Sequence, residues 1–280
     1  MMGKRLIAVS LVLCLGCVRN TGTIQKDEEA SPSGLRKAGQ HEIDVGRQIH
    51  QAITATFRVY TEPRVVGYVN RIGKSIARHA ERKNFPYQFT ILYDDRVYAT
   101  EAPGGFVYIT TGFLNFIQNE AELAAVLAHE IGELQHQDPE LDNSRRLLEL
   151  LTQTSAVVGG FFGPVGALTA GGFALLNLLN ESRAASPEER VRRADRKALH
   201  YLVEAGEDPQ GYLDLLSRFL NQDPALAPYT DDYLTSHPVT LKRYQEALAE
   251  FEKLPLAGRS LTVNRQRYLE MTKGVCEIYR

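Results

Sequence analysis

The stretch that decides the fold runs from Asn119 to Glu133 and reads Asn-Glu-Ala-Glu-Leu-Ala-Ala-Val-Leu-Ala-His-Glu-Ile-Gly-Glu. Asn119 is a preferred helix N-cap, and Glu122, three residues on, is placed to complete a capping box. Pro139 lies just past Gln137, which is where proline is common after a helix end. The pattern predicts a helix over residues 119–137.

This helix contains the string His129-Glu130-Ile131-Gly132-Glu133. In a zinc-binding helix, two histidines four residues apart lie on one face and hold one ion, and the glutamate after the first histidine acts as general base. Here the first histidine and the glutamate are present, but Glu133 stands in the place of the second histidine. Taken alone, such a string is more typical of a charged helix face than of a metal site, so the surrounding sequence decides.

Apolar residues at helical spacing and β-branched runs predict the other elements. Helices are expected over residues 41–57, 63–82, 188–205, 208–220 and 240–254, and strands over residues 87–93 and 106–110. The second strand follows the turn Pro103-Gly104-Gly105. Because helices dominate, the sequence predicts an α+β domain that is mostly helical, with a small sheet.

The composition is that of a globular protein, with 44% hydrophobic and 24% charged residues. The formal net charge is −2, which gives no electrostatic case for a nucleic-acid partner. The cysteines are Cys14, Cys17 and Cys276, and two of them lie in the N-terminal segment, so no disulfide framework is available.

The N-terminus has the layout of an export signal. Lys4 and Arg5 precede an apolar run at residues 6–15, which is about half as long as a membrane span. The ending Leu-Cys-Leu-Gly-Cys resembles a lipobox and predicts lipidation at Cys17, with an ordinary signal cleaved near Gly16 as the alternative. We expect a lipoprotein signal peptide at residues 1–17, a flexible tether at 18–40, the main domain at 41–250 and a C-terminal extension at 251–280.

Residues 150–180 contain no charged side chain. Gly159, Gly160, Pro164 and further glycines divide this segment into short pieces, and a membrane span here would put the two halves of the domain on opposite sides of the membrane. We therefore expect a buried helix and a mobile apolar loop that touches lipid or covers the site, with a true span as the alternative.

Several blocks of the chain, from about His41 to Arg243, resemble the gluzincin metallopeptidases of peptidase family M48, the family of the CAAX prenyl protease. The blocks in chain order are Tyr68-Val69-Asn70-Arg71-Ile72-Gly73, Phe85-Pro86-Tyr87-Gln88-Phe89, Ala99 with residues 103–110, residues 119–132, Ala194-Asp195-Arg196, Ala205-Gly206-Glu207-Asp208-Pro209, and Ser236-His237-Pro238 with Thr240 and Arg243. The resemblance implies a zincin-like (gluzincin) peptidase domain at residues 41–250 and a zinc cofactor.

The resemblance also implies roles for single residues. Glu130 is the expected general base, His129 the anchor ligand, and Asp195 a supporting residue that orients the site. The third ligand of the family stands four residues before Asp195, where this chain has Val191, which has no donor atom. Substrate is expected to bind as an added strand along an edge strand that contains Gly104, Gly105, Phe106 and Tyr108.

Three functions remain open. The first is a degenerate or inactive member, a pseudoenzyme that keeps the metalloprotease fold and acts in envelope protein quality control or assembly. The second is an active zinc metalloendopeptidase that degrades misfolded envelope proteins with a rearranged site of His129, Glu133 and His237, the histidine of the late His-Pro loop. The third is an assembly or lipid-contacting factor in which residues 150–180 matter most.

Two further side chains are weaker ligand candidates, because His136 lies about 10 Å from His129 along its helix and Glu188 about 4.5 Å from Val191. The expected partners are unfolded or misassembled envelope proteins or an outer-membrane assembly complex, with the membrane contacted through the N-terminal lipid. The expected location is the cell envelope, lipid-anchored at the outer membrane and facing the periplasm, since Val18 after the lipidated cysteine is not an acidic retention signal.

Overall fold

The computed structural model describes residues 32–135 and 186–275. Contacts divide the chain into residues 1–38 and residues 39–280, and the architecture below is that of the second unit. Cys17 with the signal peptide, His136, the apolar segment 150–180 and Cys276 lie outside the described residues. Within the described part, no helix is long and apolar enough to cross a membrane.

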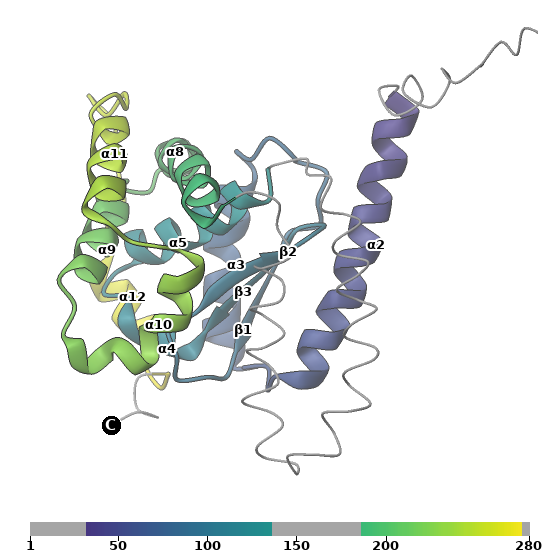
Figure 1. Cartoon of the computed structure of the whole chain (residues 1–280), viewed down its shortest axis with the longest axis horizontal. Helices are drawn as coiled ribbons and strands as arrows, with labels where there is room; N and C mark the ends of the chain where they lie inside the picture. The colour runs from purple at the N-terminus through teal and green to yellow at the C-terminus, as the bar shows by residue number, and fades with distance from the viewer. Residues whose placement is uncertain (1–31, 136–185, 276–280) are drawn as a thin grey trace, which may run out of the picture. The chain divides into compact units, whose positions relative to one another are not determined.

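Among the described residues, a three-stranded mixed sheet lies beside helix α3 (Pro63–Ala77) (Figure 1). Strand β1 (Gln88–Leu92) runs parallel to β3 (Phe106–Thr110), and β3 pairs in antiparallel fashion with β2 (Ala99–Ala102). The order in the sheet is β1-β3-β2. The structure confirms the two predicted strands, whereas the sequence Ala-Thr-Glu-Ala of β2 is too short and too poor in strand-forming residues to have been recognised.

The place of β3 corrects one expectation. Phe106 and Tyr108 lie on the central strand, whose backbone is already paired with β1 on one side and β2 on the other. Gly104 and Gly105 form the turn between β2 and β3, with φ values of 80° and 98° that glycine adopts readily. The expectation of an edge strand at these four residues is therefore wrong, and the outer strands of the sheet are β1 and β2.

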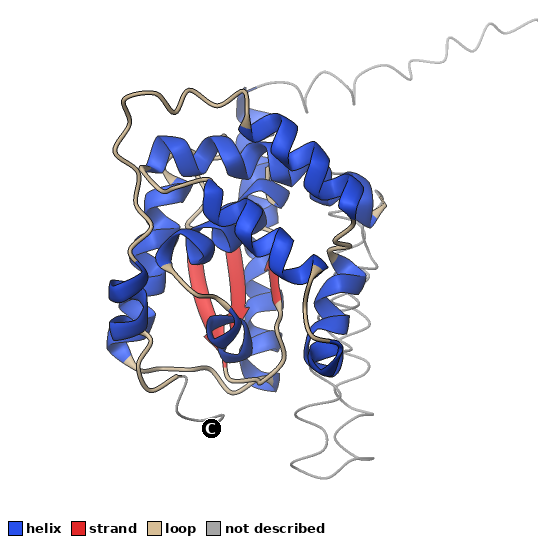
Figure 2. Ribbon diagram, turned by 90° about the vertical axis from the view of Figure 1, so that its left-hand side faces the viewer, coloured by secondary structure: helices blue, strands red, loops and turns tan. Residues whose placement is uncertain are grey.

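Helices surround the sheet, as the ribbon in Figure 2 shows. In the first part of the chain they are α2 (Pro32–Thr56), α3 (Pro63–Ala77), α4 (Thr111–Phe116) and α5 (Glu120–Glu133). In the second part they are α8 (Pro187–Ala205), α9 (Gln210–Leu220), the 3-10 turn η1 (Pro224–Leu226), α10 (Ala227–Ser236), α11 (Leu241–Phe251) and α12 (Arg265–Met271). The predicted α+β, mostly helical class is confirmed.

Helix α2 begins at Pro32, so residues 32–40 of the expected tether are helical. An existing helix extends at little cost because each added residue contributes one backbone hydrogen bond. Further along α2, the ring of His50 stacks on Phe106 of β3 at 4.9 Å between centroids, and its Nδ1 lies 3.1 Å from the hydroxyl of Tyr108. This side of β3 therefore faces α2.

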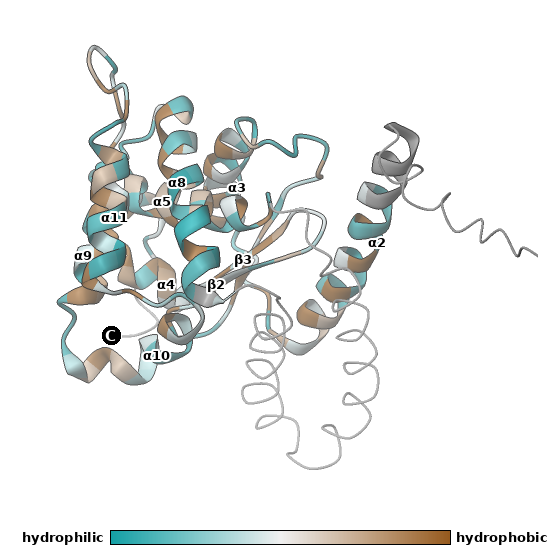
Figure 3. Cartoon of the chain, turned by 45° about the horizontal axis from the view of Figure 1, so that its top comes forward, coloured by the Kyte–Doolittle hydropathy of each residue, from teal (hydrophilic) through white to brown (hydrophobic). Residues whose placement is uncertain are grey.

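The opposite side of β3 faces α5, the buried central helix, because side chains alternate along a strand. Helices α3, α8 and α9 pack around α5, and all residues of α5 are buried. The hydropathy colours in Figure 3 show brown along the sheet and mixed teal and brown turns along α9 and α2, as expected for helices with one buried face.

The residues of the expected C-terminal extension, as far as Val275, pack against the same unit. Tyr268 of α12 is buried against α3 and α5, and its hydroxyl donates to the carbonyl of Leu114 at 2.5 Å. Arg64 of α3 donates to the carbonyls of Glu270 and Lys273 at 3.1 and 2.8 Å. The segment that contains α12 is thus fastened to α3 and α5.

Candidate metal centre

Helix α5 carries His129, Glu130 and Glu133, and it begins as the sequence predicted. The side chain of Asn119 accepts from the N–H of Glu122 at 2.9 Å, and the carboxylate of Glu122 accepts from the N–H of Gln118 at 2.9 Å. The guanidinium of Arg218 on α9 holds the same carboxylate with contacts of 2.5 and 2.6 Å. This cap fixes the start of α5 and hence the register of its last turn.

The back of the His129 ring is held by side chains from three helices. Its Nδ1 lies 3.0 Å from the carboxylate of Asp195 on α8 and 2.9 Å from the hydroxyl of Tyr212 on α9. Tyr212 also donates to Asp195, and Arg243 of α11 donates to both Asp195 oxygens at 2.9 Å. The Nε2 atom of His129 therefore points away from this network.

The network biases the protonation of its members. Burial would raise the pKa of Asp195, but the guanidinium of Arg243 and the His129 ring lower it well below the ordinary value, so the carboxylate stays charged. Burial would likewise lower the pKa of His129, but the nearby carboxylates of Asp195 and Glu133 outweigh burial and raise it. A metal ion on His129 would have to displace a proton that these carboxylates favour.

His237 reaches the same place from the end of α10. Its Nδ1 lies 2.9 Å from Oγ of Ser236, and its ring stacks on Tyr233 at 4.4 Å between centroids. Arg243 donates to the carbonyls of His237 and Pro238 at 3.3 and 3.1 Å, which ties the His-Pro loop to the Asp195 network. Burial lowers the pKa of His237 well below its ordinary value, so the ring is neutral.

The candidate ligands converge in front of these two rings. His129, Glu130 and His237 each bring one ligand atom within 4.8 Å of the others. The Oε1 atom of Glu133 lies 3.7 Å from Nε2 of His129 and 3.9 Å from Nε2 of His237. Neither Nε2 atom has a hydrogen-bond partner in the described part of the chain.

This donor set fits a zinc ion in kind and nearly in spacing, since tetrahedral donors on zinc lie about 3.4 Å apart. Two neutral imidazole nitrogens and a carboxylate are zinc ligands, and His129, His237 and Glu133 are the residues that would hold the ion. A zinc ion there would lower the pKa of its bound water. Glu130, whose Oε1 is 3.7 Å from Nε2 of His237, would then be the nearby base.

Two residues of α8 oppose metal binding. Val191 lies one turn before Asp195 on the same helix face, is buried at 2% exposure, and has no donor atom. Arg190 is buried beside it, with its Nε 3.9 Å from Oε2 of Glu133 and an amino group 3.4 Å from the carbonyl of Ser236. A fixed positive charge next to a candidate ligand competes with a cation for it. The weaker candidate Glu188 is exposed in the first turn of α8.

Most of this site can be named from the sequence, but Tyr212 and Tyr233 cannot, because their roles depend on contacts between helices that are distant in the chain. The spacing of Arg190, Arg192, Arg193 and Arg196 predicts the solvated face of a helix, and for Arg190 this prediction is wrong, because its side chain is buried beside Glu133. Arg243 belongs to the late sequence block, which assigns it no role. The roles expected for Glu130, His129, Glu133, His237 and Asp195 remain predictions, although the structure brings all five together.

A buried helix that carries His129 and Glu130, backed by an aspartate from a second helix, is the arrangement of zinc-metallopeptidase folds. The family model described as Peptidase family M48 matches residues 63–250, which is more than half of the chain. The protein therefore belongs to peptidase family M48.

Curated relatives share this domain. The chain is 25% identical over 229 residues to the beta-barrel assembly-enhancing protease of Escherichia coli (strain K12), covering 79% of this chain and 46% of that protein. The protein of the same name from Yersinia pestis is 25% identical over 220 residues, covering 77% and 45%. A putative beta-barrel assembly-enhancing protease of Vibrio cholerae is 21% identical over 249 residues, covering 86% and 50%. The chain spans about half the length of these relatives.

Proposed function

We propose that this protein is a degenerate member of its family that works in the cell envelope in protein assembly or quality control, through binding rather than peptide cleavage. The single observation that carries the proposal is the pair Arg190 and Val191 on α8. Val191 occupies the position of a ligand without a donor atom, and Arg190 places a permanent charge 3.9 Å from Glu133. Both changes weaken zinc binding at the place where the fold would hold it.

The envelope setting rests on two independent supports. The pattern of residues 1–17 is typical of an export signal with a lipobox ending at Cys17, which supports a lipid anchor at the outer membrane, facing the periplasm. The relatives from Escherichia coli and Yersinia pestis are named for enhancing β-barrel assembly. The partners we propose are accordingly unfolded or misassembled envelope proteins or an outer-membrane assembly complex.

A second function is favoured by a specific observation. The two orphaned Nε2 atoms of His129 and His237 face Glu133, so the site can hold zinc once the competition from Arg190 is overcome. In that case the protein is a metalloendopeptidase with a rearranged zinc site, in which Glu130 acts as general base.

Zinc content separates the two functions. The full chain and its His237→Ala variant are purified from the same zinc-supplemented culture, and zinc per chain is measured by elemental analysis. The proposal expects well under one zinc per chain in both proteins. Near-stoichiometric zinc in the unmodified protein that falls in the variant overturns it in favour of the rearranged site.

A functional assay tests the binding role itself. In a strain that lacks the gene, the Glu130→Gln variant is expected to restore outer-membrane integrity as well as the unmodified chain, because no proteolytic step is needed. A Cys17→Ser variant, made without the lipid attachment site, is expected to restore it poorly. If Glu130→Gln accumulates to normal levels but fails to restore the membrane, the non-proteolytic function is wrong.

A further inference from the structure

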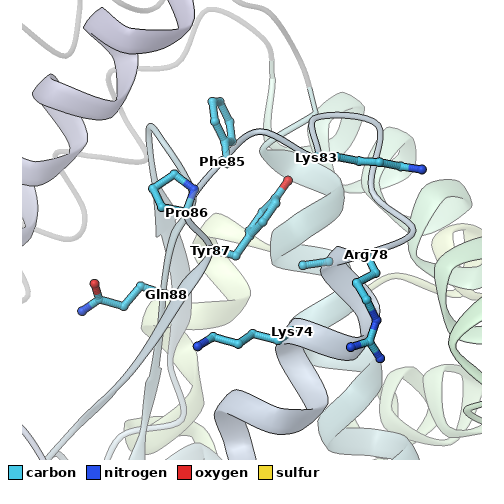
Figure 4. Close-up of a pocket in the computed structure, with 8 residues that line it drawn as sticks. Lys74, Arg78, Lys83, Phe85, Pro86, Tyr87 and Gln88 are labelled. Carbon is cyan, nitrogen blue, oxygen red and sulfur yellow. The ribbon is translucent and has the colours of Figure 1, made fainter.

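A cavity of about 610 Å³ lies between the end of α3 and the start of β1, and it shares no lining residue with the candidate metal centre. Figure 4 shows Lys74 and Arg78 extending from α3, with Gln88 across from Lys74 and the ring of Tyr87 between the two sides. Lys83 lies on the loop that joins them. The volume is in the range of small-molecule sites, and the cavity is an open depression of the surface rather than an enclosed chamber.

Three cations line this cavity, and no carboxylate does. In the described part of the chain, neighbouring charges are matched: Arg82 pairs with Glu42, and Lys197 pairs with Glu81 at 2.6 Å. None of these three cations forms an ion pair among the described residues. Arg78 donates one hydrogen bond, to the hydroxyl of Ser75 at 2.9 Å. All three side chains are exposed, so their charges are available to a ligand and together make this face locally positive in a chain whose formal net charge is −2.

The ordinary explanation for cations at a helix end is their attraction to the helix dipole. It accounts for Lys74 and Arg78 at the end of α3 but not for Lys83, which lies beyond the helix. It also does not account for the floor of the cavity, where Phe85 and Tyr87 are buried at 7% and 8% exposure. A charged rim above an apolar and aromatic floor is a binding arrangement for an anion that carries an apolar part.

The outer edge of β1, beside this cavity, offers few free backbone groups to an added peptide strand. The side-chain amide of Asn70 donates to the carbonyl of Phe89 at 2.9 Å, and the N–H of Tyr60 donates to the carbonyl of Ile91 at 2.8 Å. The N–H of Tyr93 donates to the carbonyl of Arg58 at 2.7 Å. Since the outer edge of β1 is already bonded, an extended peptide has few backbone partners there, and a compact ligand is favoured.

We propose that this cavity binds a phosphate-bearing ligand, with the phosphate held by Lys74, Arg78 and Lys83 and an apolar portion against Phe85 and Pro86. Arginine and lysine are the usual ligands of phosphate oxygens, and charge-assisted bonds to them are the stronger hydrogen bonds of proteins. Two sources carry this chemistry, a phospholipid head group and a free phosphate.

The test measures binding of two soluble probes to the full chain by calorimetry at low salt: dihexanoyl phosphatidylglycerol below its micelle concentration, and inorganic phosphate. The Arg78→Gln/Lys83→Gln variant is expected to bind at least about tenfold more weakly, since each lost charge-assisted contact weakens binding severalfold. The Lys242→Gln/Lys253→Gln variant changes the same charge at exposed positions elsewhere and is expected to bind within about twofold of the unmodified chain.

The outcomes distinguish the sources. Tighter binding of the lipid than of phosphate, lost in the Arg78/Lys83 variant only, identifies a head-group site, and equal binding of the two probes with the same loss identifies a free-phosphate site. Absence of binding by both probes overturns the proposal. Equal weakening in both double variants also overturns it, because the attraction is then a property of net charge. Matching unfolding midpoints for all three proteins exclude misfolding as the cause of a loss.

Discussion

The two sides of the His129 ring differ in how their polar groups are matched. On the Nδ1 side, Asp195 and Tyr212 contact the ring, and Arg243 donates to both of them, so the charge of Asp195 has an opposite charge in contact. On the Nε2 side, two imidazole nitrogens lack hydrogen-bond partners among the described residues, the buried side chain of Val191 offers no donor atom, and Arg190 approaches Glu133.

This difference shows that the residues that hold His129 in the fold are not the residues that would bind a metal ion. The matched side joins α5, α8, α9 and α11, so it stabilises the domain whether or not a metal binds. A chain can therefore lose metal ligands on one side of a histidine while the other side keeps the histidine in place.

The largest expected effect comes from breaking the matched side. The Arg243→Met variant leaves Asp195 charged and buried without its main partner, and we expect a loss of about 3–5 kcal/mol in the free energy of unfolding. Denaturant unfolding followed by circular dichroism measures it. The control is Arg259→Gln, whose bond to Glu204 lies at the surface and is expected to contribute under about 1 kcal/mol. Similar losses in both variants would show that the Asp195 network is not special.

The next largest effect is expected from a variant that adds a metal ligand on the Nε2 side of His129. The Arg190→Gln/Val191→Glu variant removes the competing charge and adds a carboxylate one turn before Asp195. We expect zinc affinity to rise about 100-fold, because a third or fourth protein ligand is restored and a repulsion is lost. Competition with a chromophoric chelator measures the affinity. Arg192→Gln removes one charge from an exposed position of the same helix and is expected to change affinity less than about twofold. An unchanged affinity in the double variant would mean that α8 does not face the metal position.

A smaller effect is expected at the contact between α5 and α8, the two helices that contribute residues to both sides of the His129 ring. A methyl group on Gly132 of α5 would lie 2.9 Å from the carbonyl oxygen of Ala194 on α8, which is backbone and cannot turn away. We therefore expect Gly132→Ala to destabilise the fold by about 1–3 kcal/mol. Gly67→Ala is the matched control, since Gly67 is exposed within α3 and nothing lies within 4 Å of the added atom. That variant is expected to be stabilised by about 0.5–1 kcal/mol, and a loss there instead would contradict the packing argument.

The sequence predicted the parts of this comparison that depend on local pattern. The cap at Asn119, the helix that carries His129 and the strand at residues 106–110 were predictable because capping, helical spacing and alternation are written in neighbouring residues. The middle place of β3 was not, because β2 has a weak strand sequence and sheet order depends on pairing. Tyr212 could not be found either, since it lies 83 residues from His129 in the chain and meets it only in the fold.

The smallest effect is expected at Glu207, a buried carboxyl group away from the metal centre whose ionisation makes stability depend on pH. Glu207, after α8, is buried, and burial, together with the nearby carboxylate of Glu120, raises its pKa to about 7. Its pKa is higher in the folded than in the unfolded chain, so its stabilising contribution is complete below about pH 4.5 and is lost as pH rises through about 7. Between pH 5 and 8 the unmodified protein is expected to lose about 1–2 kcal/mol relative to Glu207→Gln, which carries no titrating group at this position. Unfolding free energies of both proteins across that range measure the difference. Parallel pH curves would mean that Glu207 ionises normally and that unmatched charge is confined to the front of the metal centre.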